Sequence, residues 1–487
     1  MFLGIDVGTS SVKAVLIDEK DKLVAQGSSP LTVERPHPLW SEQDPESWWK
    51  ATVAAVRALP EQDRRQVQAI GLSGQMHGAT LLDAADKPLR PAILWNDGRS
   101  EEECAILEKT EPRSREITGN LAMPGFTAPK LVWVKRHEPD VFAKIKTVLL
   151  PKDYVRLKLA GVKASDMSDA AGTLWLDVAK RDWSDEMLAA TGLSRANMPE
   201  AVEGTAPTGN VLPAVAKELG IPDNVVVAGG GGDNASSAVG LGVVRTGDAF
   251  LSLGTSGVLF VVTDKFRPNP TKAAHAFCHA LPGRWHQMSV ILSAAANLDW
   301  VMALCGFKDI PETFTAAEKR GLHKDSPIFL PYLSGERTPH NDPTARGVFF
   351  GLSAATAKED LAHAVMEGVA FAFADGLDVL MEAGSTIGEI SVTGGGARIP
   401  YWGRLLASAL GKPMTYRQGG EVGAAFGAAR LGRLALTGEK PESICVMPPV
   451  TRVVEPEPAL KDVLAERRRI YVSLYQNLKK TFREFAT

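Results

Sequence analysis

Short apolar runs bounded by turn residues follow one another through the N-terminal part of the chain. Residues 2–7 (FLGIDV) and 12–17 (VKAVLI) enclose a Gly-Thr-Ser-Ser turn, so this pattern predicts two strands of a β-hairpin. Residues 67–72 (VQAIGL) predict a buried strand, and 79–83 with 89–94 predict a second hairpin. Farther along, strand-like runs alternate with helical periodicity, which indicates a mixed α/β architecture.

The strand–turn–strand pattern of the N-terminus occurs again in the middle of the chain. Residues 4–15 (GIDVGTSSVKAV) align with 250–261 (FLSLGTSGVLFV) when the two Gly-Thr-Ser turns are superposed. Because each copy lies between apolar runs at the start of one half of the chain, we infer an internal duplication with a boundary near 243–247. Two such halves are expected to face each other across a cleft, and clefts between domains commonly bind small ligands.

The duplication predicts the domain organisation. We expect a first domain over 1–245 and a second over 246–440. Residues 441–460 are rich in proline and are expected to form a linker. Residues 458–486 carry apolar side chains at helical spacing, so region 441–487 is expected to end in a helix that packs on the body of the protein.

Composition narrows the class of protein. The 487 residues include 45% hydrophobic and 23% charged residues, which excludes disordered and fibrous proteins. A net charge of −3 gives no electrostatic reason to expect a nucleic acid or a membrane surface as partner. The four cysteines are far apart and typical of a reducing compartment, and neither a leader sequence nor a membrane-spanning run is apparent. We therefore expect a soluble, cytoplasmic protein.

The two Gly-Thr-Ser turns are candidates for phosphate binding. Glycine lets backbone N–H groups approach a phosphate, and the hydroxyls of Thr9 and Ser10 in the first turn add donors. Gly254 and Thr255 offer the same groups in the second turn. The chain contains no Walker A sequence, so a P-loop NTPase is not expected.

Asp6 precedes the first turn by two residues, whereas the equivalent position of the second copy is Ser252. A carboxylate beside a phosphate is repulsive unless a cation bridges them. Mg²⁺ commonly binds one or two carboxylates together with substrate phosphates, so Asp6 is a candidate Mg²⁺ ligand. The structural alternative is an aspartate that caps a turn.

Two further strands run into glycines. Residues 224–234 (NVVVAGGGGDN) deliver Asp233 to an expected helix N-terminus, where an N-cap is the structural alternative. This segment also fits a dinucleotide fingerprint, but a suitable acidic residue farther on is lacking. Gly394, Gly395 and Gly396 end the second strand, a pattern typical of adenosine or phosphate across a helix N-terminus.

The order and spacing of these motifs resemble a known family. GIDVGTS, SLGTSG and TGGGAR are similar to the phosphate-1, phosphate-2 and adenosine motifs of the ASKHA superfamily, which includes actin, sugar kinases and heat-shock chaperone ATPases. Within it, the chain resembles the FGGY family of carbohydrate kinases along nearly its whole length. Residues 127–133 (TAPKLVW) are similar to the first family signature, and 347–352 with 360–367 are similar to the second.

Further runs resemble the members of this family that phosphorylate D-xylulose. They are WSEQDP (40–45), GQMHGATLLD (74–83), LWNDGR (94–99), SDMSDAAGT (165–173) and LPYLSGERTPH (330–340). The resemblance implies an α/β fold of two duplicated actin-like (ribonuclease H-like) domains with a cleft between them. The first domain would bind the sugar and the second the nucleotide.

The resemblance also implies roles for individual residues. Asp233 matches the catalytic base, and Asp6 matches the residue that organises Mg²⁺ and the transferred phosphate of ATP. Met76 and His77 match sugar contacts, and Thr255 with Gly394 to Gly396 match nucleotide contacts. Asn234 is a further candidate for the sugar, and the turn residues Thr9, Ser10 and Gly254 are further candidates for the nucleotide. Four glycines precede Asp233 where the family has three, so the sequence leaves open how far this loop extends toward the substrate. A homodimer is left open as well.

Alternative functions remain at this point. One is a kinase of the same family that acts on another ketopentose, gluconate or a polyol such as glycerol. Glycerol kinases typically carry an Arg-Glu pair where this chain has Met76 and His77, which argues against glycerol. The other is an actin-like or chaperone-type ATPase, which needs no carboxylate poised over a sugar hydroxyl and therefore fits Asp233 less well.

Overall fold

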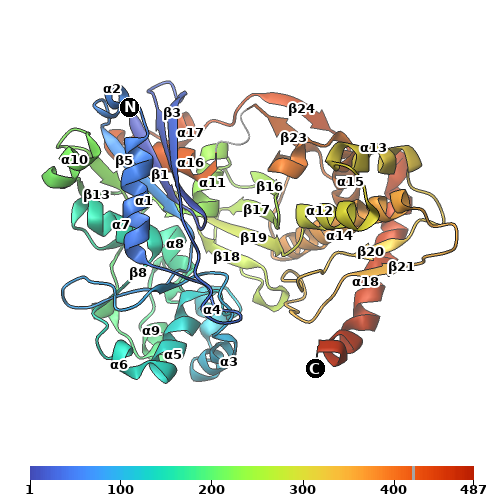
Figure 1. The fold of residues 1–487 in the computed structure, drawn as a ribbon, viewed down its shortest axis with the longest axis horizontal. Coiled ribbons are helices and arrows are strands. Elements are labelled where there is room, and N and C mark those ends of the chain that lie inside the picture. The colour runs from blue at the N-terminus through green and yellow to red at the C-terminus, as the bar shows by residue number, and fades with distance from the viewer. Residues whose placement is uncertain (419–422, 487) are drawn as a thin grey trace.

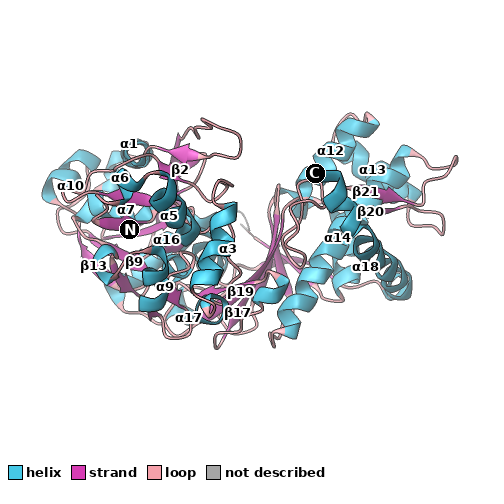
Figure 2. Ribbon diagram, turned by 90° about the horizontal axis from the view of Figure 1, so that it is seen from below, coloured by secondary structure: helices cyan, strands magenta, loops and turns pink. Residues whose placement is uncertain are grey.

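The computed structural model describes residues 1–418 and 423–486. Two α/β lobes lie side by side along the longest axis (Figure 1). Each lobe is built on a mixed sheet, and Figure 2 shows strands of the second sheet between the helices of the first lobe and those of the second.

The sheet of the first lobe has the strand order β13-β14-β5-β1-β2-β3, with β15 also paired to β5. Leu3, Ile5 and Val7 on one face of β1 and Phe2 and Gly4 on the other are buried, as a strand covered on both faces requires. The strands are β1 (Phe2–Val7), β2 (Ser11–Ile17), β3 (Leu23–Pro30), β5 (Ala69–Gly74), β13 (Pro207–Asn210), β14 (Val226–Ala228) and β15 (Gly231–Gly232).

The sheet of the second lobe has the order β18-β19-β17-β16-β22-β23-β24. β16 pairs antiparallel with β17 and parallel with β22, just as β1 pairs antiparallel with β2 and parallel with β5. This equivalence confirms the predicted duplication. The strands are β16 (Ala249–Leu253), β17 (Gly257–Thr263), β18 (His275–Cys278), β19 (Trp285–Ile291), β22 (Ile390–Thr393), β23 (Met414–Arg417) and β24 (Val450–Val454).

Helices and short strands cover both sheets. α1 begins where the Asp44 carboxylate accepts the N–H of Glu46 and Pro45 opens the first turn. In the first lobe the further elements are β4 (Glu42–Gln43), α1 (Pro45–Arg57), α2 (Glu61–Arg64), β6 (Thr80–Leu82), β7 (Ala92–Ile93), α3 (Glu101–Thr110), α4 (Ser114–Thr118), α5 (Thr127–His137), α6 (Pro139–Phe142), β8 (Thr147–Leu149), α7 (Pro151–Ala160), β9 (Ala164–Asp166), α8 (Met167–Ala171), β10 (Leu176–Asp177), β11 (Asp182–Trp183), α9 (Asp185–Thr191), β12 (Glu200–Val202), α10 (Pro213–Leu219) and α11 (Asp233–Leu241).

The long helix α14 (Lys358–Glu382) is buried along most of its length at the centre of the second lobe. The C-terminal helix α18 packs against α14, α15 and β20, as the amphipathic pattern predicts. The remaining elements of the chain are α12 (Ala295–Cys305), α13 (Ile310–Arg320), β20 (Ile328–Leu330), β21 (Val348–Phe350), α15 (Pro400–Leu410), α16 (Gly423–Thr437), α17 (Pro441–Ile444) and α18 (Pro458–Ala486).

Helix α16 comes from the C-terminal part of the chain but packs against β1 and β5 of the first lobe. The approach is close: a Cβ on Gly4 would lie 1.8 Å from the main-chain oxygen of Ala425, and one on Gly71 would lie 1.7 Å from that of Ala428. Only glycine fits such positions. The helix that the domain prediction assigned to 246–440 therefore lies on the sheet that carries Asp6.

Two expectations need correction. Residues 79–83 and 89–94 form a single isolated bridge with each other, Ala79–Ile93, because β6 pairs with β8 and β7 pairs with β4. Region 441–460, expected to be a linker, contributes β24 to the edge of the second sheet. Among the described residues, no helix has the length and apolar character that crossing a membrane requires.

Candidate active site

Asp6 lies near the end of β1, opposite Ser73 of β5 and Lys13 of β2. Its Oδ1 is buried and makes no hydrogen bond to the described residues. Burial raises the pKa of the Asp6 carboxyl, and the nearby charge of Lys13 opposes this rise. The sequence analysis did not identify Lys13, although residues directly opposite each other on paired strands share one face of the sheet.

Asp233 is the first residue of α11 and follows the short strand β15. β15 pairs with β5 through Gly231 and Ser73, so Asp6 and the glycines before Asp233 flank the same strand. Burial raises the pKa of Asp233 to about 6, and the charge of Asp6 adds to this rise. A carboxyl group with this pKa can accept a proton near neutral pH.

Asn234 holds the carboxylate of Asp233 in place. Its backbone N–H and its side-chain Nδ2 both donate to Asp233 Oδ1, at 2.7 and 2.9 Å. Asp233 Oδ2 takes no part in these bonds and remains available for another donor. The predicted sugar contact Asn234 is thus seen here orienting the candidate base.

His77 stands in the left-handed region, with φ at +69°, three residues after the end of β5. Its Nδ1 lies 2.6 Å from the main-chain oxygen of Gly172, so Nδ1 carries the proton and donates. Burial is the main reason why the pKa of His77 falls to about 3. The ring is therefore neutral at physiological pH and presents Nε2 as a hydrogen-bond acceptor.

Residues of the first family signature fix the backbone of His77. Lys130 Nζ donates to the main-chain oxygens of His77 and Gly125 at 2.9 and 2.8 Å, and Thr127 Oγ1 donates to the same His77 oxygen at 3.1 Å. Burial lowers the pKa of Lys130 to about 7. The signature therefore holds the strained His77 main chain and does not itself present a reactive group.

Met76 is buried, with 6% of its surface exposed. A Cβ on Gly232 would lie 3.0 Å from its sulfur, so Met76 packs directly beneath the residue that precedes Asp233. Met76 thus connects the predicted sugar-contact segment to the loop of the candidate base.

The first Gly-Thr-Ser turn is held by side chains of the first lobe. Thr9 Oγ1 donates to Gln75 Oε1 at 3.0 Å and accepts from Trp95 Nε1 at 3.0 Å, so the hydroxyl faces these residues. Gly8 N–H donates to the Ser11 oxygen at 3.1 Å, which closes the turn. The Ser10 side chain is exposed.

The second turn presents its threonine hydroxyl at the surface. Thr255 is exposed, so its Oγ1 can be reached from solvent. The main-chain oxygens of Gly254 and Thr255 accept from Ala295 and Ala294 N–H groups, each at 2.8 Å, which ties the turn to the start of α12. The Thr255 hydroxyl is thus available to a phosphate.

The glycines after β22 lie beside this second turn. Gly394 has φ at +93°, and a Cβ there would lie 2.7 Å from the main-chain oxygen of Leu253. A Cβ on Gly396 would lie 2.7 Å from the Leu253 side chain, whereas one on Gly395 would meet no atom within 4 Å. The structure therefore brings Gly254, Thr255 and Gly394 to Gly396 together at one end of the second sheet.

The carboxylates of the second signature have a structural role. Glu367 is buried and forms a two-point ion pair with Arg467 of α18, at 2.6 and 2.7 Å. Asp360 accepts from Arg320 and His323 at 2.7 and 2.8 Å. These ion pairs connect α14 with α18 and with the end of α13.

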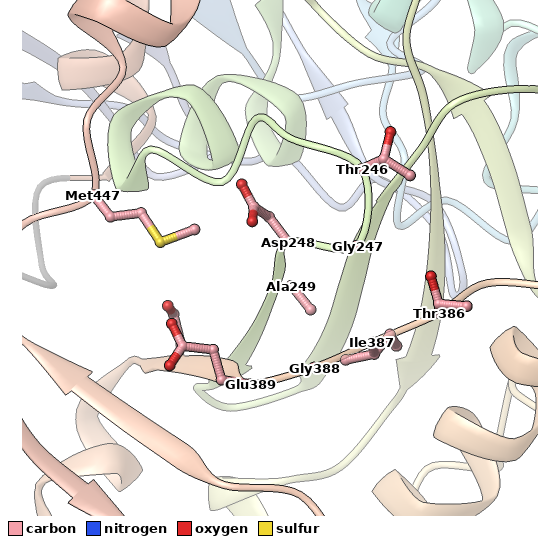
Figure 3. Close-up of a pocket in the computed structure, with 10 residues that line it drawn as sticks. Thr246, Gly247, Asp248, Ala249, Thr386, Ile387, Gly388, Glu389 and Met447 are labelled. Carbon is pink, nitrogen blue, oxygen red and sulfur yellow. The ribbon is translucent and has the colours of Figure 1, made fainter.

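A surface cavity of about 490 Å³ lies at the other end of the second sheet (Figure 3). Its lining includes Asp248, Ala249 and Glu389, which stand at the beginning of β16 and immediately before β22. The two glycine-rich turns follow the opposite ends of these strands. This cavity is therefore separate from the candidate active site.

Comparison with known proteins identifies the family. The model of the FGGY family of carbohydrate kinases, N-terminal domain, matches residues 1–240, and that of the C-terminal domain matches 249–436. A curated xylulose kinase from Escherichia coli (strain K12) is 55% identical over 481 residues, which cover 98% of this chain and 99% of that protein.

Solved structures of similar proteins agree with the matches to the family. A xyloylose kinase from Brucella ovis is 51% identical and has a TM-score of 0.94, with 99% of both chains covered. Plasmodium falciparum glycerol kinase with ADP has a TM-score of 0.88 at 20% identity over 97% of each chain, and shows the shared fold. The two lobes, the paired turns and the matches to both domain models lead to one conclusion: the chain belongs to the FGGY family of carbohydrate kinases.

Proposed function

We propose that the protein transfers the γ-phosphoryl group of ATP to D-xylulose, giving D-xylulose 5-phosphate and ADP, with Asp233 as the general base. The observation that carries this proposal is the carboxylate of Asp233, whose pKa of about 6 suits proton transfer. The similarity to curated xylulose kinases supports the choice of sugar.

The nucleotide would bind between the two turns. Backbone N–H groups and hydroxyls of Thr9, Ser10 and Thr255 would meet the phosphates, and Gly254 with Gly394 to Gly396 would let ATP approach the backbone. Because Thr9 Oγ1 is already bonded to Gln75, we propose that Thr9 contributes chiefly its backbone N–H.

Asp6 fits a Mg²⁺ ligand because its Oδ1 is buried without a hydrogen-bond partner among the described residues. No group of three or more His, Cys, Asp or Glu side chains in the described part of the chain could hold an ion alone. Asp6 would therefore share Mg²⁺ with the phosphates of ATP, as this ion prefers. Bound Mg²⁺ would neutralise charge on the transferred phosphoryl group.

The sugar would bind on the side of His77. A sugar hydroxyl would donate to His77 Nε2, Asn234 would contact the sugar near Asp233, and Met76 would support the sugar face. In the reaction, the primary hydroxyl gives its proton to Asp233 while its oxygen bonds to the γ-phosphorus of ATP. The bond from phosphorus to the β–γ bridging oxygen breaks, and ADP leaves.

One assay separates the candidate functions. Purified protein with ATP and Mg²⁺ is offered D-xylulose, D-ribulose, L-ribulose, gluconate and glycerol, and both ADP and the phosphorylated sugar are measured. We expect the highest kcat/KM with D-xylulose and one sugar phosphate for each ADP. Another preferred sugar would retain the family and change the substrate, whereas ADP formation without a sugar phosphate would support an actin-like or chaperone-type ATPase.

Two further proposals concern the state of the protein. Cys104, Cys278 and Cys445 are buried free thiols, which suits the cytoplasm. A homodimer is the proposed oligomeric state, and light scattering of the purified protein tests it.

A further inference from the structure

A buried charge cluster lies behind the candidate site. Lys152 Nζ lies 2.6 Å from Asp153, 2.8 Å from Asp166 and 3.1 Å from Asp169, and all four side chains are fully buried. Such burial is costly unless the charges are paired. None of these residues has a part in the phosphoryl transfer proposed above.

The cluster is connected to the loop of the candidate base. The Asp166 carboxylate caps α8 by accepting a hydrogen bond from the backbone N–H of Ser168 at 2.8 Å. It also accepts a hydrogen bond from the hydroxyl group of Ser168. Ser168 Oγ in turn accepts the backbone N–H of Gly232 at 3.0 Å. Gly232 immediately precedes Asp233, so the chain from Lys152 to Gly232 ends one residue from the candidate base.

Arg156 holds the beginning of the same loop. Its side chain is fully buried and interacts with Asp153 at 3.8 Å. It donates to the main-chain oxygens of Ala228 and Gly229. The glycine-rich segment before Asp233 is thus held at both ends by the cluster.

The other end of α8 reaches the sugar side. Gly172 directly follows α8, and its main-chain oxygen accepts a hydrogen bond from Nδ1–H of His77. A Cβ on Gly172 would lie 2.6 Å from Cε1 of His77 and 2.7 Å from Cε of Met76, so the helix end also packs against both predicted sugar contacts.

We propose that α8, anchored by the cluster around Lys152, is a positioning element that sets the distance between the candidate base and the sugar-binding histidine. Ser168 positions Asp233 through Gly232, and Gly172 positions His77. This inference rests on the proposed function, because it assigns the two ends of α8 to the two sides of the acceptor site. It predicts that the two ends have separable kinetic effects.

Ser168→Ala tests the first end, with Ser165→Ala as matched control. Both hydroxyls are buried, but that of Ser165 makes no hydrogen bond within the described residues. Misplacement of a reacting group by about 1 Å costs roughly a hundredfold in rate. We expect Ser168→Ala to lower kcat about tenfold to a hundredfold with little change in either KM, and Ser165→Ala to retain the wild-type kcat.

Gly172→Ala tests the second end. The added methyl displaces the ring of His77, so we expect the KM for D-xylulose to rise more than about tenfold while the KM for ATP stays within about twofold. Melting temperatures of all variants monitor folding. If Gly172→Ala does not fold, the double variant Gly172→Ala/His77→Ala is compared with His77→Ala, and equal sugar KM values are expected because the added methyl acts through the ring of His77. A further rise of the sugar KM in the double variant would contradict the positioning of His77 by Gly172.

Equal kcat values for Ser168→Ala and Ser165→Ala would overturn the inference. A uniform loss of activity in Ser168→Ala and Gly172→Ala, with unchanged KM values and lowered melting temperatures, would do the same and show a purely structural role. The proposed function is judged separately by Asp233→Asn. An inactive Asp233→Asn beside a fully active Ser168→Ala would retain the base and remove the positioning role.

Discussion

Asp6 and Asp233 are brought together by one strand, since Asp6 lies opposite Ser73 of β5 and Gly232, the residue before Asp233, lies opposite Gly74 of β5. Each carboxyl group has a raised pKa because of burial, and the charge of Asp6 raises that of Asp233 further. Two neighbouring carboxyl groups can therefore have different roles: Asp6 would bind the cation, and Asp233 would accept the proton.

The pH dependence of the reaction should separate the base from the sugar site. Asp233, with a pKa of about 6, is protonated below that pH and cannot accept a proton. We expect kcat/KM for D-xylulose to fall about tenfold per pH unit below pH 6, because this ratio reports the ionisation of the free enzyme. His77, with a pKa of about 3, stays neutral, so the KM for the sugar should be constant from pH 5 to 8. A sugar KM that rises below pH 6.5 would contradict the neutral histidine.

Gly395→Val tests the adenosine side. A side chain at Gly395 meets no atom within 4 Å, so the substitution should leave folding intact and obstruct only the nucleotide. We expect the KM for ATP to rise at least about tenfold, with the sugar KM nearly unchanged. Gly388→Val is the matched control, because Gly388 has equal space and lies in the cavity of Figure 3. Equal ATP KM values in the two variants would remove Gly395 from the site.

Asp6→Ala tests the metal ligand. Loss of the carboxylate should lower kcat by more than about a hundredfold at saturating Mg²⁺, since metal coordination contributes several kcal/mol to charge stabilisation. Sugar affinity, measured by calorimetry without nucleotide, should stay within about threefold of wild type. A nearly normal kcat would make Asp6 a structural turn residue.

Glu336 offers a test of stability. It is 2% exposed, and burial raises its pKa to about 8, far above that of an exposed glutamate. A carboxyl group whose pKa is raised on folding contributes stability below its unfolded pKa and loses it as pH rises toward the folded value. We expect wild-type unfolding free energy to fall relative to Glu336→Gln by up to about 1.4 kcal/mol per pH unit between pH 5 and 8. Parallel pH profiles in urea unfolding would show that Glu336 is charged in the folded protein.

Local patterns were sufficient to predict the motifs that end the central strands. Asp6, the two Gly-Thr-Ser turns and Asp233 each follow an apolar run, and the structure places them at strand ends as expected. The mispredicted hairpin shows the limit of such patterns. β6 pairs with β8, which begins only at Thr147, and nothing in the local sequence of either strand specifies a partner so far along the chain.

The residues that position the candidate site could not be predicted from the sequence either. Lys152 and Ser168 lie on separate helices, and only the fold connects them with Asp233. Burial could not be inferred either, since a lysine in a helix of ordinary composition is normally exposed. β24 was missed because its proline-rich surroundings favour a loop, whereas pairing with β23 provides its hydrogen bonds.

The central claim is that Asp233 accepts the proton of the sugar hydroxyl, and turnover by Asp233→Asn tests it most directly. Asparagine retains the size and hydrogen bonding of aspartate but cannot take the proton. Steady-state kinetics with D-xylulose should show a kcat lowered about 10²- to 10⁴-fold or more, with both KM values within a few-fold of wild type. A variant that turns over D-xylulose at more than about a tenth of the wild-type rate would contradict the base assignment.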